Sequence, residues 1–392
     1  MIERLRRLNW IQFAGVVALI AAGTVAIWSA GNARSEAIFH GKWLDNLATA
    51  AFGLVVYFAL ALTDYRRLVT LAAVPAYAVA LGLLALVLLV GTSQLGGKRW
   101  LWFFQPSEVS KLCILMMLAW MYGLDDLRWR GFGGFCLAGV VIGVPALLIL
   151  KEPDLGTALT LVPACLAMLL VAGVWRTGLV TIMAVMTVAA VMVIGAVGEA
   201  ERPGTSPERR AEILSYVPLK PHQVKRIKVF LYPDDDIHGA GYNDRQAKLA
   251  IASGGVSGKG IGKGESNRLA YLPQAVSMND FIFCVWAEET GFIGNLVLLA
   301  LFGTVLVTGA WTAYRATDEC GRMLALGVSM LIFAHVFINI AMSIGLVPIT
   351  GLPLPFISAG RTFLVVVLAG LGLTQSVAIY GRENLTWESS HS

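Results

Sequence analysis

The chain has 392 residues, of which 57% are hydrophobic and only 14% charged, and its formal net charge is +5. An ordinary soluble domain contains roughly 45–50% apolar and about 25% charged residues, so this composition excludes that class. The mean hydropathy of +0.71 indicates an integral membrane protein.

Ten apolar runs approach or exceed the length of a membrane-spanning helix. A hydrocarbon core about 30 Å thick needs roughly twenty apolar residues of helix, and the runs 68–90 and 177–198 contain no charge at all. We predict an all-α polytopic protein with ten transmembrane helices, forming a single membrane domain over residues 1–392. The predicted spans are 9–30, 44–63, 68–90, 107–123, 132–150, 155–173, 177–198, 281–312, 323–347 and 351–380.

Lysines and arginines in the short loops predict the orientation. If the N-terminus is cytoplasmic, the inner segments hold eleven arginines and the outer ones five lysines and arginines. The positive-inside rule therefore favours cytoplasmic N- and C-termini. Residues 199–280, between the seventh and eighth spans, become one large extracytoplasmic loop. Because topology accounts for the basic residues, the positive charge does not indicate nucleic-acid binding.

Two clusters of polar residues mark the outer ends of the spans near residues 98–111 and 154. Lys98 and Arg99 precede the sequence QPSEVSK, in which Ser107 suits a helix N-cap. Glu108 and Lys111 are three residues apart and can pair on one helix face; beside Arg99 they would form a cationic pocket. Asp154 fits a helix cap better than a ligand.

A polar stripe crosses the ninth span, where His335, Asn339 and Ser343 recur every four residues. Polar groups at membrane depth face the bundle interior or a cavity. Hydrogen bonds between helices explain the stripe as well as transport does. The five cysteines have no paired spacing, so we expect neither a disulfide framework nor a zinc site.

The large insertion contains two segments of interest. Residues 223–231 (QVKRIKVFL) alternate basic and apolar side chains and predict an amphipathic segment or a solvated loop. Residues 254–264 (GGVSGKGIGKG) are not a Walker loop, because Lys259 and Lys263 are each followed by glycine. Glycine N–H groups and two lysines could bind an anion; a flexible turn is the alternative.

The insertion ends at Asp280, at the start of the eighth span. Ser277-Met278-Asn279-Asp280 has the spacing of a capping box, which would give Asp280 a structural role. Its position at the outer membrane surface also suits a carboxylate that removes a proton from a substrate hydroxyl. Both interpretations stay open at this point.

Five motifs in order resemble the SEDS family (shape, elongation, division and sporulation): GGKRW with QPSEVSK; EPDLGTAL; the segment from RIKVFLYP to GGVSGKG; LPQAVSMNDFIF with AEETGFIG; and NIAMSIGLVPITGLPLPFIS. The resemblance covers nearly the whole chain. The FLYP-to-GKG segment and the short N-terminus look more like RodA, the elongation branch, than FtsW, the division branch.

The resemblance implies a peptidoglycan glycosyltransferase that polymerises lipid II in the bacterial cytoplasmic membrane, with its active site extracytoplasmic. Asp280 matches the family's catalytic aspartate and would be the general base of an inverting transfer that expels undecaprenyl pyrophosphate. Residues expected to bind substrate or pyrophosphate are Lys98, Arg99, Glu108, Lys111, Lys259, Lys263, Ser358 and Arg361. The family also implies a divalent cation, Mg²⁺ or Mn²⁺, with unknown ligands, and a class B penicillin-binding protein as partner, docked on the eighth and ninth spans.

Two motifs depart from the family pattern. LPQAVSMND replaces LPExHTD, so that Gln274 stands for a glutamate and two residues are added before Asp280. Ser358-Ala359-Gly360-Arg361-Thr362 replaces SYGGS, and Arg361 either binds phosphate or snorkels. Three alternative functions remain open: a lipid II flippase or lipid-linked precursor carrier, the division-specific FtsW-like paralogue, and a catalytically weakened scaffold for a partner enzyme.

Overall fold

The structure is a computed structural model, and it describes residues 2–33, 39–94, 97–101, 104–123, 130–152, 154–202, 204–217, 219–233, 239–269 and 271–381. The helices that match the predicted spans are α2 (Trp10–Asn32), α3 (Lys42–Ala61), α4 (Tyr65–Val90), α5 (Pro106–Gly123), α6 (Phe132–Lys151), α7 (Leu155–Val171), α8 (Arg176–Ala200), α14 (Ile282–Arg315), α15 (Glu319–Ser343) and α16 (Arg361–Tyr380). The other elements are α1 (Ile2–Arg6), β1 (Thr92–Gln94), β2 (Gly97–Trp100), α9 (Pro207–Ser215), α10 (Pro221–Leu231), α11 (Ala240–Ser253), α12 (Glu265–Arg268) and α13 (Gln274–Met278).

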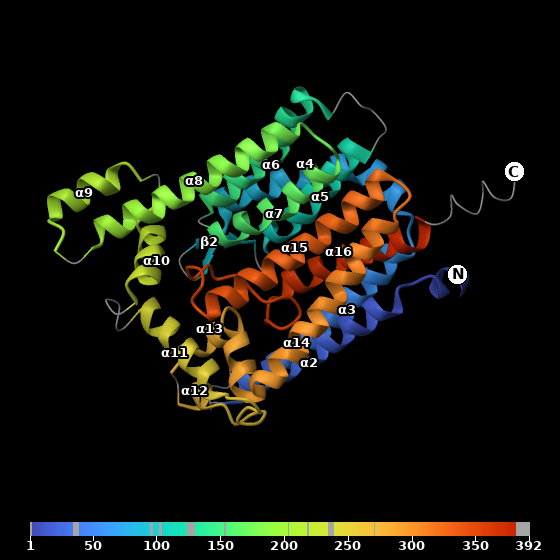
Figure 1. Cartoon of the computed structure of the whole chain (residues 1–392). Coiled ribbons are helices and arrows are strands. Elements are labelled where there is room, and N and C mark those ends of the chain that lie inside the picture. Colours follow the sequence, from blue (N-terminus) through green and yellow to red (C-terminus); the bar gives the residue numbers. More distant parts are fainter. Residues whose placement is uncertain are drawn as a thin grey trace, which may run out of the picture.

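The long helices form one bundle, and the insertion lies at one end of it (Figure 1). Within the described residues, eight helices are long and apolar enough to cross a membrane. The two remaining matches are α5, which carries Glu108 and Lys111, and α7, which has 17 residues. The chain is therefore a helical protein with several candidate membrane spans, and the full set of ten stays a prediction.

The bundle is built around α15 and α16, the most buried of the candidate spans, whereas α8 is almost entirely uncovered. Glycines let α3 and α16 approach closely: a Cβ on Gly372 would lie 2.5 Å from the carbonyl oxygen of Tyr57, and one on Gly53 2.5 Å from Leu368 Cδ1. Small residues at such crossings allow backbones to pack tightly in a membrane.

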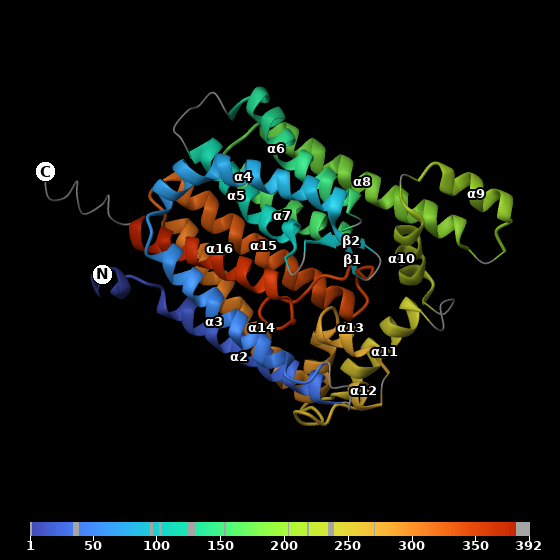
Figure 2. The same ribbon diagram turned by 180° about the vertical axis from the view of Figure 1, so that it is seen from behind.

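The start of α2 and the end of α16 lie at the end of the bundle opposite to the insertion, as Figure 2 shows from behind. A hydrogen bond of 2.8 Å from the Asn9 main-chain N–H to Gln375 Oε1 joins these two helices. Because the first and last long helices begin and end at the same end of the bundle, the chain crosses the bundle an even number of times between them. The predicted topology, with both termini on one side of the membrane, requires such an even number.

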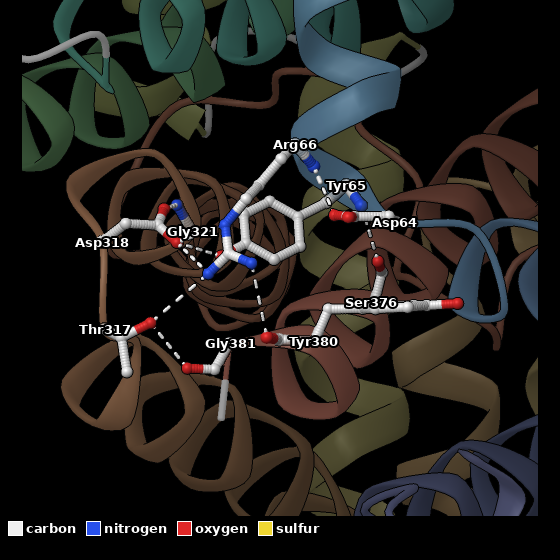
Figure 3. Close-up of polar contacts among 9 residues, drawn as sticks. All are labelled: Asp64, Tyr65, Arg66, Thr317, Asp318, Gly321, Ser376, Tyr380 and Gly381. Atoms are coloured by element: carbon white, nitrogen blue, oxygen red, sulfur yellow. Dashed lines mark hydrogen bonds and ion pairs between the residues drawn. The ribbon is translucent and has the colours of Figure 1, made fainter. Parts of the chain in front are cut away.

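The same end holds a polar cluster that ties α4, α15 and α16 together (Figure 3). Arg66 Nη2 lies 2.7 Å from Asp318 Oδ2, which also accepts a hydrogen bond from the Tyr65 hydroxyl. Asp318 Oδ1 caps α15 by accepting from the Gly321 N–H at 2.7 Å, and the Tyr65 N–H donates to Ser376 Oγ at 3.0 Å. We call this group the basal cluster.

The structure corrects two expectations about the elements. The tenth span begins at Arg361 rather than 351; residues 344–360 are irregular because Pro348, Pro353 and Pro355 cannot continue a helix. The all-α prediction missed the short antiparallel hairpin of β1 and β2, which carries Arg99. The insertion contains the helices α9 to α13, and its amphipathic segment 223–231 is helical, within α10.

Candidate active site

Asp280 lies in the turn between α13 and α14, facing the irregular segment 344–360. Its carbonyl oxygen accepts a hydrogen bond of 2.9 Å from Asn339 Nδ2, which also donates to the Leu352 carbonyl at 2.6 Å. A Cβ added at Gly351 would lie 3.4 Å from Asp280 Oδ2, so glycine at this position lets the segment approach the carboxylate. The predicted capping role is wrong: α14 begins at Ile282 and has no side-chain cap.

Two guanidinium groups act on the Asp280 carboxylate. The pKa of Asp280 is raised to about 6, chiefly by burial, although Arg226 and Arg99 oppose the increase; Asp154 adds to it. Arg226, on α10, donates from Nη1 to the Thr350 carbonyl at 2.8 Å. Arg99 was predicted from the sequence and Arg226 was not, because residues 223–231 were expected to lie on the membrane surface or in a solvated loop.

Arg99 is fixed by the end of α6 and the start of α7. Its Nε donates to the Glu152 carbonyl at 3.2 Å, and its Nη1 lies 3.9 Å from Asp154 Oδ1. Asp154 caps α7 as predicted, accepting from the Thr157 N–H at 3.1 Å, and it also accepts from Gln105 Nε2 at 3.2 Å. The hairpin of β1 and β2 therefore brings the Arg99 guanidinium close enough to act on the Asp280 carboxylate, although the two residues are far apart in the sequence.

Glu152 is an additional carboxyl group near Arg99, and its position in the sequence did not predict a role in the site. Its side chain is fully buried, and neither carboxylate oxygen has a hydrogen-bond partner among the described residues. The pKa of Glu152 is raised to about 8, mainly by burial and also by Asp154, with Arg99 acting in the opposite direction. This carboxyl is therefore mostly protonated at neutral pH.

Glu108 and Lys111 form the predicted pair, at 2.7 Å, but deep in the bundle. Lys111 is fully buried, and its Nζ lies 2.8 Å from His335 Nε2 on α15. His335, Asn339 and Ser343 are all buried, which confirms that the polar stripe faces inward. Lys111 therefore joins α5 to α15 below the site and has no exposed surface for a substrate.

Ser107 does not cap α5. The helix begins one residue earlier, at Pro106, and the Ser107 hydroxyl accepts a hydrogen bond from Gln105 Nε2 at 3.1 Å. A cap at Ser107 would require the helix to begin at residue 108, so the N-cap prediction is wrong by two residues.

The glycine-rich segment 254–264 does bind carboxylates, but they belong to α14. Lys259 Nζ lies 2.9 Å from Glu288 Oε1, and the Gly264 and Glu265 N–H groups donate to Glu289 and Glu288 at 3.3 and 2.9 Å. Such backbone concavities favour anions. Since Glu288 is eight residues beyond Asp280, or about 12 Å of helical rise, the structure does not bring Lys259 to Asp280.

The segment also supports a break in α14. Gly291 has a φ of 66°, and the N–H groups of Phe292 and Ile293 donate to the carbonyls of Gly255 and Val256 at 2.9 and 3.1 Å. It is thus an ordered support rather than a flexible turn. The Lys263 side chain is exposed on it.

Ser358 and Arg361 contact other parts of the site region. Ser358 Oγ donates to the Asn279 carbonyl at 2.6 Å and accepts from the Leu354 N–H at 2.8 Å, so it holds the backbone beside Asp280. Arg361 Nη2 lies 2.6 Å from Asp45 Oδ2, near the surface. The side chains of Lys98 and Gln274 fall outside the described part of the chain.

The described residues form no preformed binding site for a divalent cation. The described part of the chain contains no group of three His, Cys, Asp or Glu side chains placed to hold a metal ion. Mg²⁺ at a diphosphate uses one or two carboxylates together with substrate oxygens. The ligands therefore stay unassigned.

Comparisons with known proteins give a family for this arrangement. The family model for FtsW, RodA and SpoVE, described as cell cycle protein, matches residues 9–383. Peptidoglycan glycosyltransferase MrdB of Escherichia coli K12 is 33% identical over 376 residues, covering 92% of this chain and 91% of MrdB. The probable peptidoglycan glycosyltransferase FtsW of Trichlorobacter lovleyi is 34% identical over 385 residues, covering 96% and 94%.

Solved structures are similar over nearly the same length. A chain of a peptidoglycan synthase complex, studied for the structural coordination of polymerization and crosslinking, has a TM-score of 0.71 at 28% identity, covering 95% of this chain and 97% of that one. The rod shape determining protein RodA of Thermus thermophilus has a TM-score of 0.63 at 26% identity, covering 95% and 96%. This chain therefore belongs to the FtsW/RodA/SpoVE family of membrane proteins.

Proposed function

We propose that this protein is a peptidoglycan glycosyltransferase that polymerises lipid II, with Asp280 as its general base. MrdB and FtsW bear that activity in their names and align over more than nine tenths of this chain. The observation that carries the proposal is the position of Asp280, a partly buried carboxylate on which Arg99 and Arg226 both act.

The reaction requires a base of moderate strength. Asp280 takes the proton from the 4-hydroxyl of the incoming N-acetylglucosamine, and that oxygen attacks the anomeric carbon of the terminal N-acetylmuramic acid of the growing chain. The bond from that carbon to the diphosphate breaks, undecaprenyl diphosphate leaves, and the linkage inverts from α to β. With a pKa raised to about 6, Asp280 is ionised at neutral pH and more basic than an ordinary aspartate.

The leaving diphosphate requires fixed positive charge. Arg99 and Arg226 each donate one hydrogen bond to a main-chain carbonyl, of Glu152 and Thr350 respectively, which holds both guanidinium groups in place. Donors that are already oriented stabilise developing negative charge without reorganisation. We assign the diphosphate of the growing chain to this pair.

We place the site on the extracytoplasmic face of the bacterial cytoplasmic membrane, with both termini cytoplasmic. The excess of arginine at the opposite end supports this orientation. A divalent cation on the diphosphate remains part of the proposal, without assigned ligands. A class B penicillin-binding protein is the proposed partner, because a similar chain belongs to a complex that couples polymerization to crosslinking.

We propose a role in cell-wall elongation rather than division. The fold similarity to RodA supports it, and the similar identities to MrdB and FtsW keep the division role as the alternative. Expression in strains depleted of either native protein separates the two: restored rod shape supports elongation, and restored septation alone supports division.

Fluorescent lipid II tests the activity directly. Purified protein in vesicles, with a divalent cation and a co-purified transpeptidase, should produce glycan ladders, and Asp280→Ala should produce none. Glu212→Gln, which removes an exposed carboxylate on α9 in the same insertion, is the matched control and should retain the ladders. Ladders from Asp280→Ala would reject this residue as the base, and lipid scrambling without ladders would indicate a carrier instead.

A further inference from the structure

A polar cavity borders the turn that carries Asp280. It has a volume of about 200 Å³, and its polar lining comes from Lys42, Asp45 and Asn46 on α3, Asn279 before Asp280, and Arg361 on α16. Neither Arg99 on β2 nor Arg226 on α10 is among the residues that line this cavity. The cavity therefore reaches the Asp280 turn through Asn279 and apart from those two arginines.

The cavity contains an amide with unsatisfied hydrogen-bonding groups. Asn46 is 2% exposed, and neither its Nδ2 nor its Oδ1 has a hydrogen-bond partner among the described residues. Buried polar side chains are nearly always paired. An unpaired amide that lines a cavity thus indicates a ligand that both accepts and donates hydrogen bonds, as an N-acetylated sugar does.

The cavity shares Arg361 with an apolar groove. This groove has a volume of about 500 Å³ and is lined mainly by apolar side chains of α3, α5 and α16, among them Phe52, Val109 and Val365. Since α3 and α16 are candidate membrane spans, the groove opens at the lipid-facing surface of the bundle. A hydrocarbon chain fits its lining.

The charged side chains at the border between the polar cavity and the apolar groove indicate what kind of ligand group would bind there. Arg361 contacts Asp45 at 2.6 Å, and Lys42 lies 4.0 Å from the same carboxylate. Two cations against one anion leave the rim with a net positive charge. The matching ligand is therefore amphipathic, with a hydrocarbon chain, an anionic junction and a polar sugar.

We infer that Arg361 joins a sugar pocket to a lipid groove and that together they bind the acceptor substrate, the incoming isoprenoid diphosphate. This inference rests on the proposed function, because polymerisation needs two lipid-linked diphosphates at one base. The acceptor's diphosphate stays intact and needs less stabilisation than the leaving group held by Arg99 and Arg226. Asp280 would then lie between the donor and acceptor sites.

Binding measured without turnover tests the inference. The full chain carrying Asp280→Asn, in phosphatidylcholine nanodiscs, should bind two lipid II molecules. Adding Arg361→Gln should weaken one of the two sites roughly ten-fold, because a charge-assisted contact is lost. Adding Asp45→Asn should tighten the same site about two- to five-fold, because a competing carboxylate is removed.

The groove has its own matched pair of variants. Ala48→Trp fills the groove from α3 and should weaken the site that Arg361→Gln weakens. Ala184→Trp, on the exposed surface of α8, should leave both sites unchanged.

Three outcomes would overturn the inference: a single lipid II site, a loss of affinity in both Arg361→Gln and Asp45→Asn with lowered melting temperatures, or displacement of lipid II from this site by phosphatidylglycerol. The second would assign the Arg361–Asp45 contact to structure alone. Two sites with the expected dependence but no glycan ladders from the unsubstituted protein would instead uphold the binding site and contradict the proposed activity.

Discussion

Asp280→Asn should abolish activity while making the protein more stable at neutral pH. Burial raises the pKa of this carboxyl from 3.8 to about 6, so the folded state disfavours its ionised form. A difference of that size corresponds to at most about 3 kcal/mol at pH 7, less whatever solvent screening the partial exposure provides. The stability attached to this group is fully present below pH 3.8 and is lost as the pH rises through about 6.

The asparagine variant does not ionise, so its apparent melting temperature should exceed that of the unsubstituted protein at pH 7. The difference should shrink as the pH falls toward 4. Polymerisation should fall about 10²- to 10⁴-fold, the usual value of a positioned general base. Differential scanning fluorimetry in detergent and the ladder assay measure the two effects on the same samples. If the melting temperature of the variant exceeded that of the unsubstituted protein by the same amount at pH 4 and at pH 7, the burial cost assigned to Asp280 would be refuted.

Three further substitutions test other groups. Glu152→Gln should be more stable than the parent at pH 9 and equally stable near pH 4. Burial raises the pKa of Glu152 to about 8, so the folded parent loses stability as the pH rises through that value. A constant difference in stability between variant and parent from pH 4 to pH 9 would argue against this pKa. Arg226→Gln should lower kcat about 10²-fold with Arg226→Lys intermediate, and full activity in both would remove Arg226 from the site. Asp318→Asn should lower unfolding free energy by roughly 1–3 kcal/mol, because Arg66 loses its carboxylate in the basal cluster, while the KM for lipid II stays unchanged; a raised KM would connect the basal cluster to the distant site.

The sequence predicted the helices well where lipid is the solvent, because long apolar runs have few alternatives in a bilayer. It failed where local chemistry overrides hydropathy. The prolines at 348, 353 and 355 end the regular structure before Arg361, and a break at Gly291 divides α14. Both features lie near the candidate site, where an irregular backbone brings polar groups together.

Site residues were predictable when they lay at the ends of spans. Asp280 and Arg99 were selected because charge at a membrane boundary is conspicuous. Asp154 was expected only to cap a helix, and the structure adds its effect on Asp280. Arg226 was missed because its contact with the Thr350 carbonyl depends on how α10 packs against a segment more than a hundred residues away. Lys259 was predicted to bind a diphosphate, and its ion pair with Glu288 was not foreseen, because spacing alone does not reveal a tertiary neighbour.

The pH dependence of kcat/KM for lipid II polymerisation tests the central claim most directly. With Asp280 as the base, the rate should rise with pH and reach half of its plateau near pH 6, where this carboxyl ionises in the free enzyme. Arg226→Gln should move that midpoint upward, because a cation that favours the ionised form is lost. A profile that stays flat from pH 5 to pH 8 would contradict the assignment.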